Sequence, residues 1–294
     1  MAAGPSPIRP LELVALRRLD GLLQGDYRGL FPGLGSEWSD ARTYVPGDDP
    51  RRIDWPVTAR TGETMVRDTI VDHELELWLV VDTSASLAFG TGRAEKAAVA
   101  RDIAGTLGLV AARGGNRVGC MTAGSGVVVP ARSGRAHLAA VLAALDRPAD
   151  GAKDALASTL SSLGRLAVRP AMVVVISDLL ASDGWPRAMR ALAARHDVIA
   201  VEVVDGRELA LPDVGFVQLV DPESGRRRVV DTRDQRVRAD YAIAAHEQRV
   251  RIASEIRSAG AHHLRVRTDG DWIADLVRFV ITRRQQQLAS NGAR

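Results

Sequence analysis

The stretch of sequence that decides the fold is residues 75–86, LELWLVVDTSAS. Its first part is an apolar run interrupted by Glu76, which is typical of a buried strand in a parallel sheet. Directly after that run, Asp82, Ser84 and Ser86 place one carboxylate and two hydroxyls on alternate residues. Because ligands of open α/β sheets bind beyond the carboxyl ends of strands, this loop is the first place to look for a site.

The following residues alternate between apolar runs and helical patterns. Strands are predicted at residues 117–122, 126–130, 171–176, 198–204 and 262–266. Helices are predicted at residues 93–113, 156–163, 185–195 and 237–256, together with one that Ser133 caps and one that Asp271 caps. Residues 214–219 and 228–231 predict a hairpin. This order predicts an α/β fold with a mostly parallel sheet and helices on both faces.

A second polar strand end is predicted at Ser177 and Asp178, which follow the apolar run 173–176. Since parallel strands end at the same edge of a sheet, Asp178 is expected near the Asp82–Ser86 loop. Carboxylate and hydroxyl oxygens are ligands that Mg²⁺ favours, and Mn²⁺ accepts the same donors. The alternative is that these residues only form turns and helix caps.

The loop Asp82–Ser86 together with Asp178 resembles the metal-ion-dependent adhesion site of von Willebrand factor A domains. The resemblance implies a Rossmann-like fold, with Asp82, Ser84, Ser86 and Asp178 as metal ligands. The family's threonine has its best counterpart at Lys153, within Gly151–Asp154. Two alternatives follow: a bound Mg²⁺ or Mn²⁺, or a Lys153 ammonium that replaces the metal between the two aspartates.

Residues 44–55, YVPGDDPRRIDW, form a second signature, continued by residues 59–62, ARTG. This signature resembles the bacterial family called domain of unknown function fifty-eight. Pro46-Gly47 fits a type II turn, and Trp55 is expected in the core. The acidic and basic side chains predict an ion-pair lattice, which either staples the segment to the main domain or docks a partner. The signature positions are Tyr44, Gly47, Asp48, Asp49, Arg51, Arg52, Asp54, Trp55 and Arg60.

The sequence predicts three parts. Residues 1–72, with a helix at 9–24 and the signature, are expected to pack on the main domain because they hold too little apolar surface to fold alone. Residues 73–284 form the von Willebrand factor A-like domain. Residues 285–294 are predicted to be a flexible tail.

The family resemblance implies a binding function. Genes of this family commonly sit beside those of MoxR-type AAA+ ATPases, which implies an adaptor or co-chaperone whose site receives an acidic residue of a partner. A stand-alone recognition or adhesion-type domain is the alternative, and a metal-dependent hydrolase is less favoured. The histidines have no metal-ligand spacing, and no P-loop or dinucleotide fingerprint is present, so we expect no enzyme.

Composition excludes further classes. The net charge is +3 with acidic residues interspersed among the basic ones, so a specific nucleic-acid surface is not expected. Cys120 is the single cysteine, so neither an intrachain disulfide nor a cysteine zinc site can form. No apolar stretch reaches the roughly 18–20 residues of a membrane span, and the N-terminus lacks a signal-peptide core, so a cytoplasmic location is expected.

Overall fold

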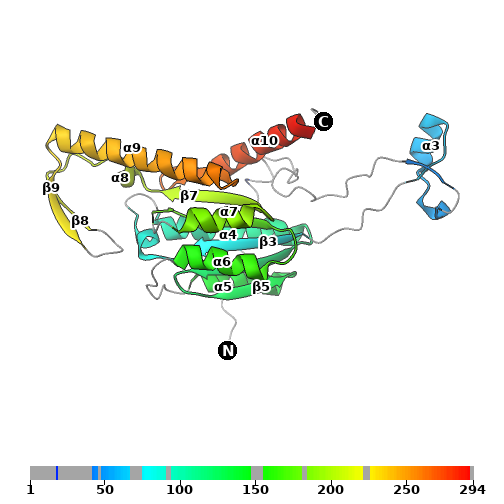
Figure 1. Ribbon diagram of the computed structural model, residues 1–294, viewed down its shortest axis with the longest axis horizontal. Coiled ribbons are helices and arrows are strands. Elements are labelled where there is room, and N and C mark those ends of the chain that lie inside the picture. Colours follow the sequence, from blue (N-terminus) through cyan, green and yellow to red (C-terminus); the bar gives the residue numbers. More distant parts are fainter. Residues whose placement is uncertain are drawn as a thin grey trace.

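A six-stranded sheet forms the centre of the computed structural model (Figure 1). The structure describes residue 18 and residues 42–45, 48–66, 75–90, 94–146, 155–180, 184–220 and 226–291. In spatial order, the strands are β10 (His262–Arg267), β7 (Asp197–Val204), β6 (Met172–Ser177), β3 (Glu76–Asp82), β4 (Arg117–Ala123) and β5 (Val128–Arg132). All neighbouring strands are parallel except β4 and β5.

The strand order places a topological switch point between β3 and β6. Numbered along the chain within this sheet, the strands follow the order 3-2-1-4-5-6 of doubly wound folds, in which the chain reverses direction across the sheet after its third strand. The prediction of a von Willebrand factor A-like, mostly parallel α/β fold is therefore confirmed. Asp82 ends β3 and Ser177 ends β6, so both polar strand ends lie at this switch point.

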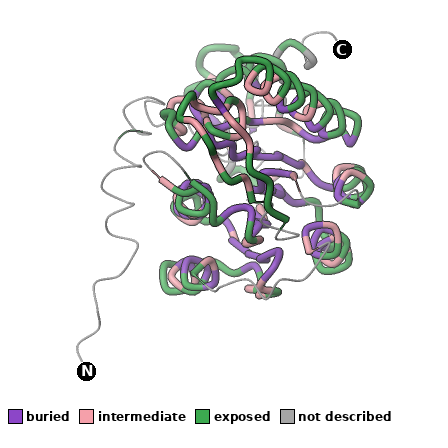
Figure 2. Tube along the Cα trace, turned by 90° about the vertical axis from the view of Figure 1, so that its left-hand side faces the viewer, coloured by how far each residue is buried: buried purple, intermediate pink, exposed green. Residues whose placement is uncertain are grey.

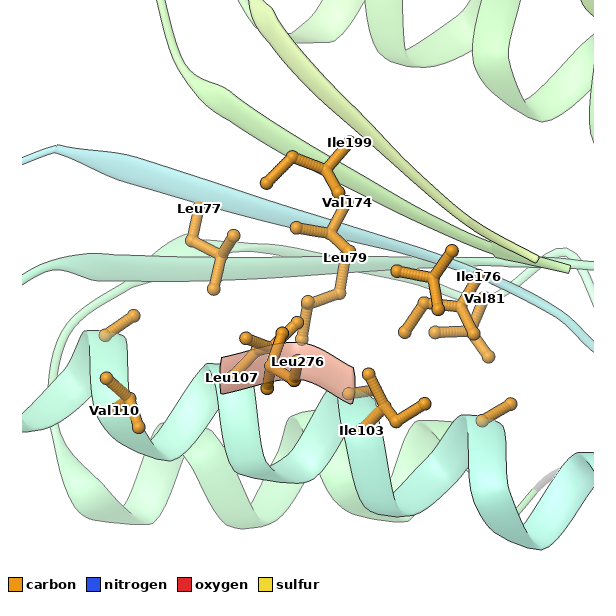
Figure 3. Packing of buried hydrophobic residues seen from close by; sticks show 14 of the residues in the cluster. Leu77, Leu79, Val81, Ile103, Leu107, Val110, Val174, Ile176, Ile199 and Leu276 are labelled. Atoms are coloured by element: carbon orange, nitrogen blue, oxygen red, sulfur yellow. The ribbon is translucent and has the colours of Figure 1, made fainter. Parts of the chain in front are cut away.

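Helices cover both faces of the sheet, because alternate residues of each strand point to opposite sides. Leu77, Leu79 and Val81 of β3 join one apolar cluster, and Trp78 and Val80 join the other (Figure 3 shows the first). The first cluster contains α4 (Lys96–Arg113), α5 (Arg135–Leu145) and α10 (Trp272–Asn291). The second contains α6 (Ala155–Leu166), α7 (Trp185–Ala193) and α9 (Gln235–Ser258). In Figure 2 the strands are buried between helices whose outer sides are exposed.

The predicted hairpin is confirmed as β8 (Phe216–Val220) and β9 (Arg227–Asp231), which form a separate two-stranded sheet. Phe216 is 70% exposed, and Val220 and Val229 are exposed with it. The hairpin lies at the end of the molecule to which the start of α9 extends (Figure 1). Between β7 and the hairpin lies the single-turn helix α8 (Gly206–Leu209).

Two helix ends differ from the predictions. Helix α5 begins after Gly134, whose φ of 101° only glycine adopts easily, and no side chain caps it, so the predicted cap at Ser133 is wrong. Helix α10 continues to Asn291, into the segment predicted as a tail. Its predicted cap is present, because the Ala274 amide donates to Asp271 at 3.3 Å.

The signature residues form a small unit. It contains β1 (Arg42–Thr43), the 3₁₀ helix η3 (Pro50–Arg52), α3 (Trp55–Thr61) and β2 (Met65–Val66), with β1 and β2 antiparallel. Trp55 is 67% exposed, so its expected place in the core is wrong: it is the first residue of α3, and its side chain faces outward there. The packing of residues 1–72 on the main domain stays a prediction.

Two expectations from composition can be compared with the structure. Cys120 is fully buried, and its burial raises the pKa of the thiol to about 12, as expected for an inert core residue. Among the helices that the structure describes, none combines the length and apolar character that crossing a bilayer requires.

Candidate functional site

Asp82 is held at the end of β3 by its neighbours. Its Oδ1 accepts a hydrogen bond from the Ser84 amide at 2.8 Å, and its Oδ2 accepts one from the Ser177 hydroxyl at 2.6 Å. Burial raises the pKa of Asp82, the charge of Asp178 raises it further, and the hydrogen bonds from Ser177 and Ser84 oppose that rise. Asp82 and Asp178 are therefore electrostatic neighbours, as their strand ends predict.

The two serines of the loop contact each other. Ser84 precedes the short 3₁₀ helix η4 (Ala85–Ala88), and its Oγ lies 3.0 Å from the Oγ of Ser86. Ser86 is buried, whereas Ser84 is half-buried. Ser84 is thus the more exposed residue of this pair.

Asp178 is bound by a lysine. The Nζ of Lys96, the first residue of α4, lies 2.7 Å from Asp178 Oδ2 and also pairs with Glu208 of α8. The side chains of Lys96 and Asp178 are both fully buried. An ammonium ion buried without a carboxylate would be strongly disfavoured, so these groups depend on one another.

Arg249 of α9 extends this pairing toward β7. Its guanidinium donates to Glu202 at 3.1 Å, to Glu208 at 3.2 Å and to the backbone carbonyl of Asp178 at 3.2 Å. The Oε2 of Glu202 also contacts His263 Nε2 at 2.8 Å and accepts from Arg265 Nε at 2.7 Å. Burial works to raise the pKa of Glu202, but the hydrogen bonds from His263 and Arg265 and the charges of Arg265 and Arg249 outweigh it and lower that pKa.

These residues form what we call the ion cluster: Lys96, Asp178, Glu202, Glu208, Arg249 and Arg265. Cations and carboxylates are equal in number. The cluster connects five elements of the main domain, α4, β7, α8, α9 and β10, to the end of β6.

The backbone after Asp178 is strained. Leu179 has a φ of 56°, in the left-handed region that non-glycine residues seldom adopt. The conformation is held because the Leu179 amide donates to Ser177 Oγ at 3.0 Å and the Leu180 amide donates to Asp178 Oδ1 at 3.1 Å. Strain of this kind persists where the surrounding contacts fix it, and it clusters at functional sites.

Sequence reasoning missed most of the ion cluster. As one alternative to a metal, it expected a lysine between the aspartates, at Lys153, which lies outside the described residues with the rest of Gly151–Asp154. The lysine that the structure brings to Asp178 is Lys96. A signal was present, because Lys96 and Lys153 are the only lysines among 39 basic residues.

The oxygen donors at this edge fit a divalent cation poorly. Each oxygen of Asp82 and of Asp178 already accepts from a protein donor, and one of those donors is the Lys96 ammonium. Within the described ranges, no three His, Cys, Asp or Glu side chains converge as metal ligands. Metal ligation by Asp82, Ser84, Ser86 and Asp178 stays a prediction from the resemblance.

In the signature unit, the carboxylates bind backbone amides. Asp48 accepts from Val45 at 2.9 Å, Asp49 caps η3 and Asp54 caps α3. Tyr44 contributes its amide to the carbonyl of Thr64 at 2.8 Å. These contacts account for the acidic positions as turn and cap residues. The ion-pair lattice with Arg51, Arg52 and Arg60 stays a prediction, and Gly47 lies outside the described residues.

Mycobacterial proteins are similar to this chain in sequence. "Uncharacterized protein Rv1480" of Mycobacterium tuberculosis is 47% identical over 289 residues, which cover 97% of this chain and 91% of that protein. "Uncharacterized protein MAV169" of Mycobacterium avium is 46% identical over 164 residues, which cover 55% of this chain and 96% of that protein.

Solved structures with a similar arrangement share little sequence. The conserved hypothetical protein BatB from Bacteroides thetaiotaomicron has a TM-score of 0.44 at 14% identity, covering 72% of this chain and 99% of that one. A von Willebrand factor type A protein from Catenulispora acidiphila has a TM-score of 0.34 at 15% identity, covering 48% and 34%. The family model described as "Protein of unknown function DUF58" matches residues 40–251, and the chain belongs to this family.

Proposed function

We propose that this protein is a non-enzymatic protein-binding module that acts as an adaptor or co-chaperone for a MoxR-type AAA+ ATPase. The observation that carries the proposal is the hydroxyl of the half-buried Ser84 at the switch point of the sheet, where the ion cluster meets the end of β6. A polar group such as the Ser84 hydroxyl can receive a side chain of a partner when paired, buried residues such as those of the ion cluster fix the surrounding structure. The choice of ATPase comes from the family resemblance.

The state of the charged groups supports binding over catalysis. Lys96, Asp178, Glu202, Glu208 and Arg249 pair with one another, so each has its charge compensated within the protein. A general acid or base must instead reach a substrate with a proton to move. The ion cluster therefore serves better as a support than as a catalytic set.

The partner group that we propose is an acidic side chain. A hydroxyl can donate to a carboxylate in a charge-assisted hydrogen bond, and the Ser84 hydroxyl can do so while Ser86 donates to it. Such bonds contribute about 1.5–3 kcal/mol, so one of them changes affinity by roughly tenfold or more.

The test is a binding titration between the purified chain and a MoxR-type ATPase of the same organism. We expect saturable binding, and we expect Ser84→Ala to raise the Kd about tenfold. Ser158→Ala is the matched control, because Ser158 is exposed on α6 and bonds only locally to Ala155. Absence of binding to the ATPase, with capture of a different protein through the same edge, would favour a stand-alone recognition domain.

A further inference from the structure

We infer that the Lys96 ammonium is the built-in cation of the strand-end site and that the site works without a divalent metal. The inference rests on the proposed function only in its choice of site. It does not depend on which partner binds there.

Lys96 occupies one of the two carboxylates that a metal at this site would need. Asp178 is the second carboxylate that the adhesion-site resemblance assigns to the metal, and its Oδ2 lies 2.7 Å from Lys96 Nζ. Glu208 binds the same ammonium, and the Phe89 ring lies 5.8 Å from it. Lys96 is 0% exposed, so bulk water cannot replace these partners in solvating its ammonium group.

The charges of the ion cluster are balanced without Asp82, so the obstacle to a metal at Asp82 is the nearby Lys96 ammonium. Lys96, Arg249 and Arg265 match the charges of Asp178, Glu202 and Glu208. Asp178 is a neighbour of both Asp82 and Lys96. A divalent ion bound at Asp82 would therefore be repelled by the nearby Lys96 ammonium. In a buried environment this repulsion is only weakly screened.

Lys96 is the first residue of α4, a position that disfavours a positive charge. A cation in the first turn of a helix is opposed by the helix dipole. The turn before the helix also needs Gly90, because a Cβ there would lie 2.5 Å from the Glu95 Cα. The Lys96 amide then donates to the Phe89 carbonyl at 3.0 Å. A residue that breaks a local rule at a buried and paired position indicates a role in the site.

One consequence concerns the partner. Its acidic group would meet the Ser84 hydroxyl and no metal, so partner binding should survive a chelator. This differs from a metal-bridged adhesion site, in which a chelator removes the contact.

The test is a calorimetric titration of Mg²⁺ and of Mn²⁺ into the full chain after treatment with EDTA. We expect no saturable binding by the native chain and an unchanged Tm on adding either ion. Lys96→Ala leaves the buried Asp178 carboxylate without its cation and Glu208 with Arg249 alone, so its Tm should fall by about 10 °C. Millimolar Mg²⁺ or Mn²⁺ should recover part of that loss and bind with one equivalent.

Lys153→Ala is the matched arm for the other lysine and should behave as the native chain does. Metal binding gained by Lys153→Ala instead of Lys96→Ala would assign the cation to Lys153 and overturn the inference. Binding of one equivalent by the native chain, lost in Ser86→Ala, would overturn it as well, and this result needs no folded Lys96 variant. Because the titration uses the isolated chain, failure to bind the ATPase would leave its result intact.

Discussion

His196 lies at the opposite end of the sheet from the site, just before β7, and its burial has a consequence for the whole chain. The residue is buried, and neither ring nitrogen has a hydrogen-bond partner among the described residues. Burial lowers the pKa of His196 below its ordinary 6.5, and the charge of Arg195 lowers it further. The folded state therefore binds this proton less readily than the unfolded state does.

The direction of the pH effect follows from that difference. A lowered histidine pKa contributes stability above pH 6.5, and that stability is lost as the pH falls toward the folded-state pKa. We expect His196→Leu to flatten this part of the curve and to raise the free energy of unfolding at pH 5 by about 1 kcal/mol. Urea unfolding at pH 5 and at pH 7.5 measures it.

The matched control for this change is His246→Leu, because His246 is exposed on α9. An unchanged slope in His196→Leu would contradict the assignment. His262 acts in the same direction, since burial and the charge of Arg283 lower its pKa, so part of the acid sensitivity should remain.

At the scale of elements, α8 is a single turn that delivers Glu208 to the ion cluster. Asp205 caps it: its Oδ1 accepts from the Arg207 amide at 2.9 Å, and its Oδ2 accepts from the Thr268 hydroxyl at 2.8 Å. The Asp205 amide in turn donates a hydrogen bond to Glu208 Oε2 at 3.2 Å. The cap therefore positions the carboxylate that binds Lys96.

We expect Asp205→Ala to destabilise the fold by about 2–3 kcal/mol, since it removes a cap and a buried hydrogen bond. Asp234→Ala is the matched control, because Asp234 caps α9 from an exposed position and should cost only about 1 kcal/mol. Chemical unfolding of both variants gives the comparison. Equal losses would mean that the Thr268 contact and the position of α8 contribute little.

The secondary-structure elements could be predicted from local sequence patterns, but the side-chain contacts between them could not. Apolar runs identified β3, β6 and β7, and helical spacing identified α4 and α9. The start of α5 failed because Gly134 begins it through backbone conformation, which a search for side-chain caps does not detect. The contacts among Lys96, Arg249 and Glu208 could not be predicted from sequence, since nothing in their own segments indicates partners 41 to 112 residues away.

One member of the ion cluster did leave a sequence signal. Glu202 is the single charged residue within the apolar run 198–204, and a carboxylate on a buried strand needs a cation. That signal predicts a buried ion pair without naming the other member. Trp55 shows the converse: a large aromatic residue in a family signature predicts burial, yet it is exposed where it starts α3.

For the whole molecule, the two apolar clusters define what must be present for folding. All their buried residues fall between Leu77 and Val280. Arg18 and Asp271 form an ion pair at 2.5 Å, but both side chains are about half exposed, and such pairs contribute little. Among the described residues, the apolar packing of these two clusters therefore lies within the main domain.

We expect a fragment that starts at His73 to unfold in one cooperative transition, with a Tm within about 5 °C of the full chain. Thermal unfolding followed by circular dichroism checks this. A fragment that starts at Thr83 is the control, because it lacks the central strand β3 and should not fold. A broad transition in the His73 fragment would show that residues 1–72 complete the core.

Helix α9 carries a mechanical consequence. Its 24 residues span about 36 Å. Three of its buried residues, Arg249, Ile252 and Ile256, lie in its second half, and the fourth, Ala245, lies just before the middle. The hairpin is attached to its first turn, beyond the sheet (Figure 1). The C-terminal part of α9 is thus anchored in the core, whereas its N-terminal part carries the hairpin. Arg249 is the residue through which the helix contacts the carboxylates of the ion cluster. A force on strands β8 and β9 would therefore reach those charges through α9 as a torque.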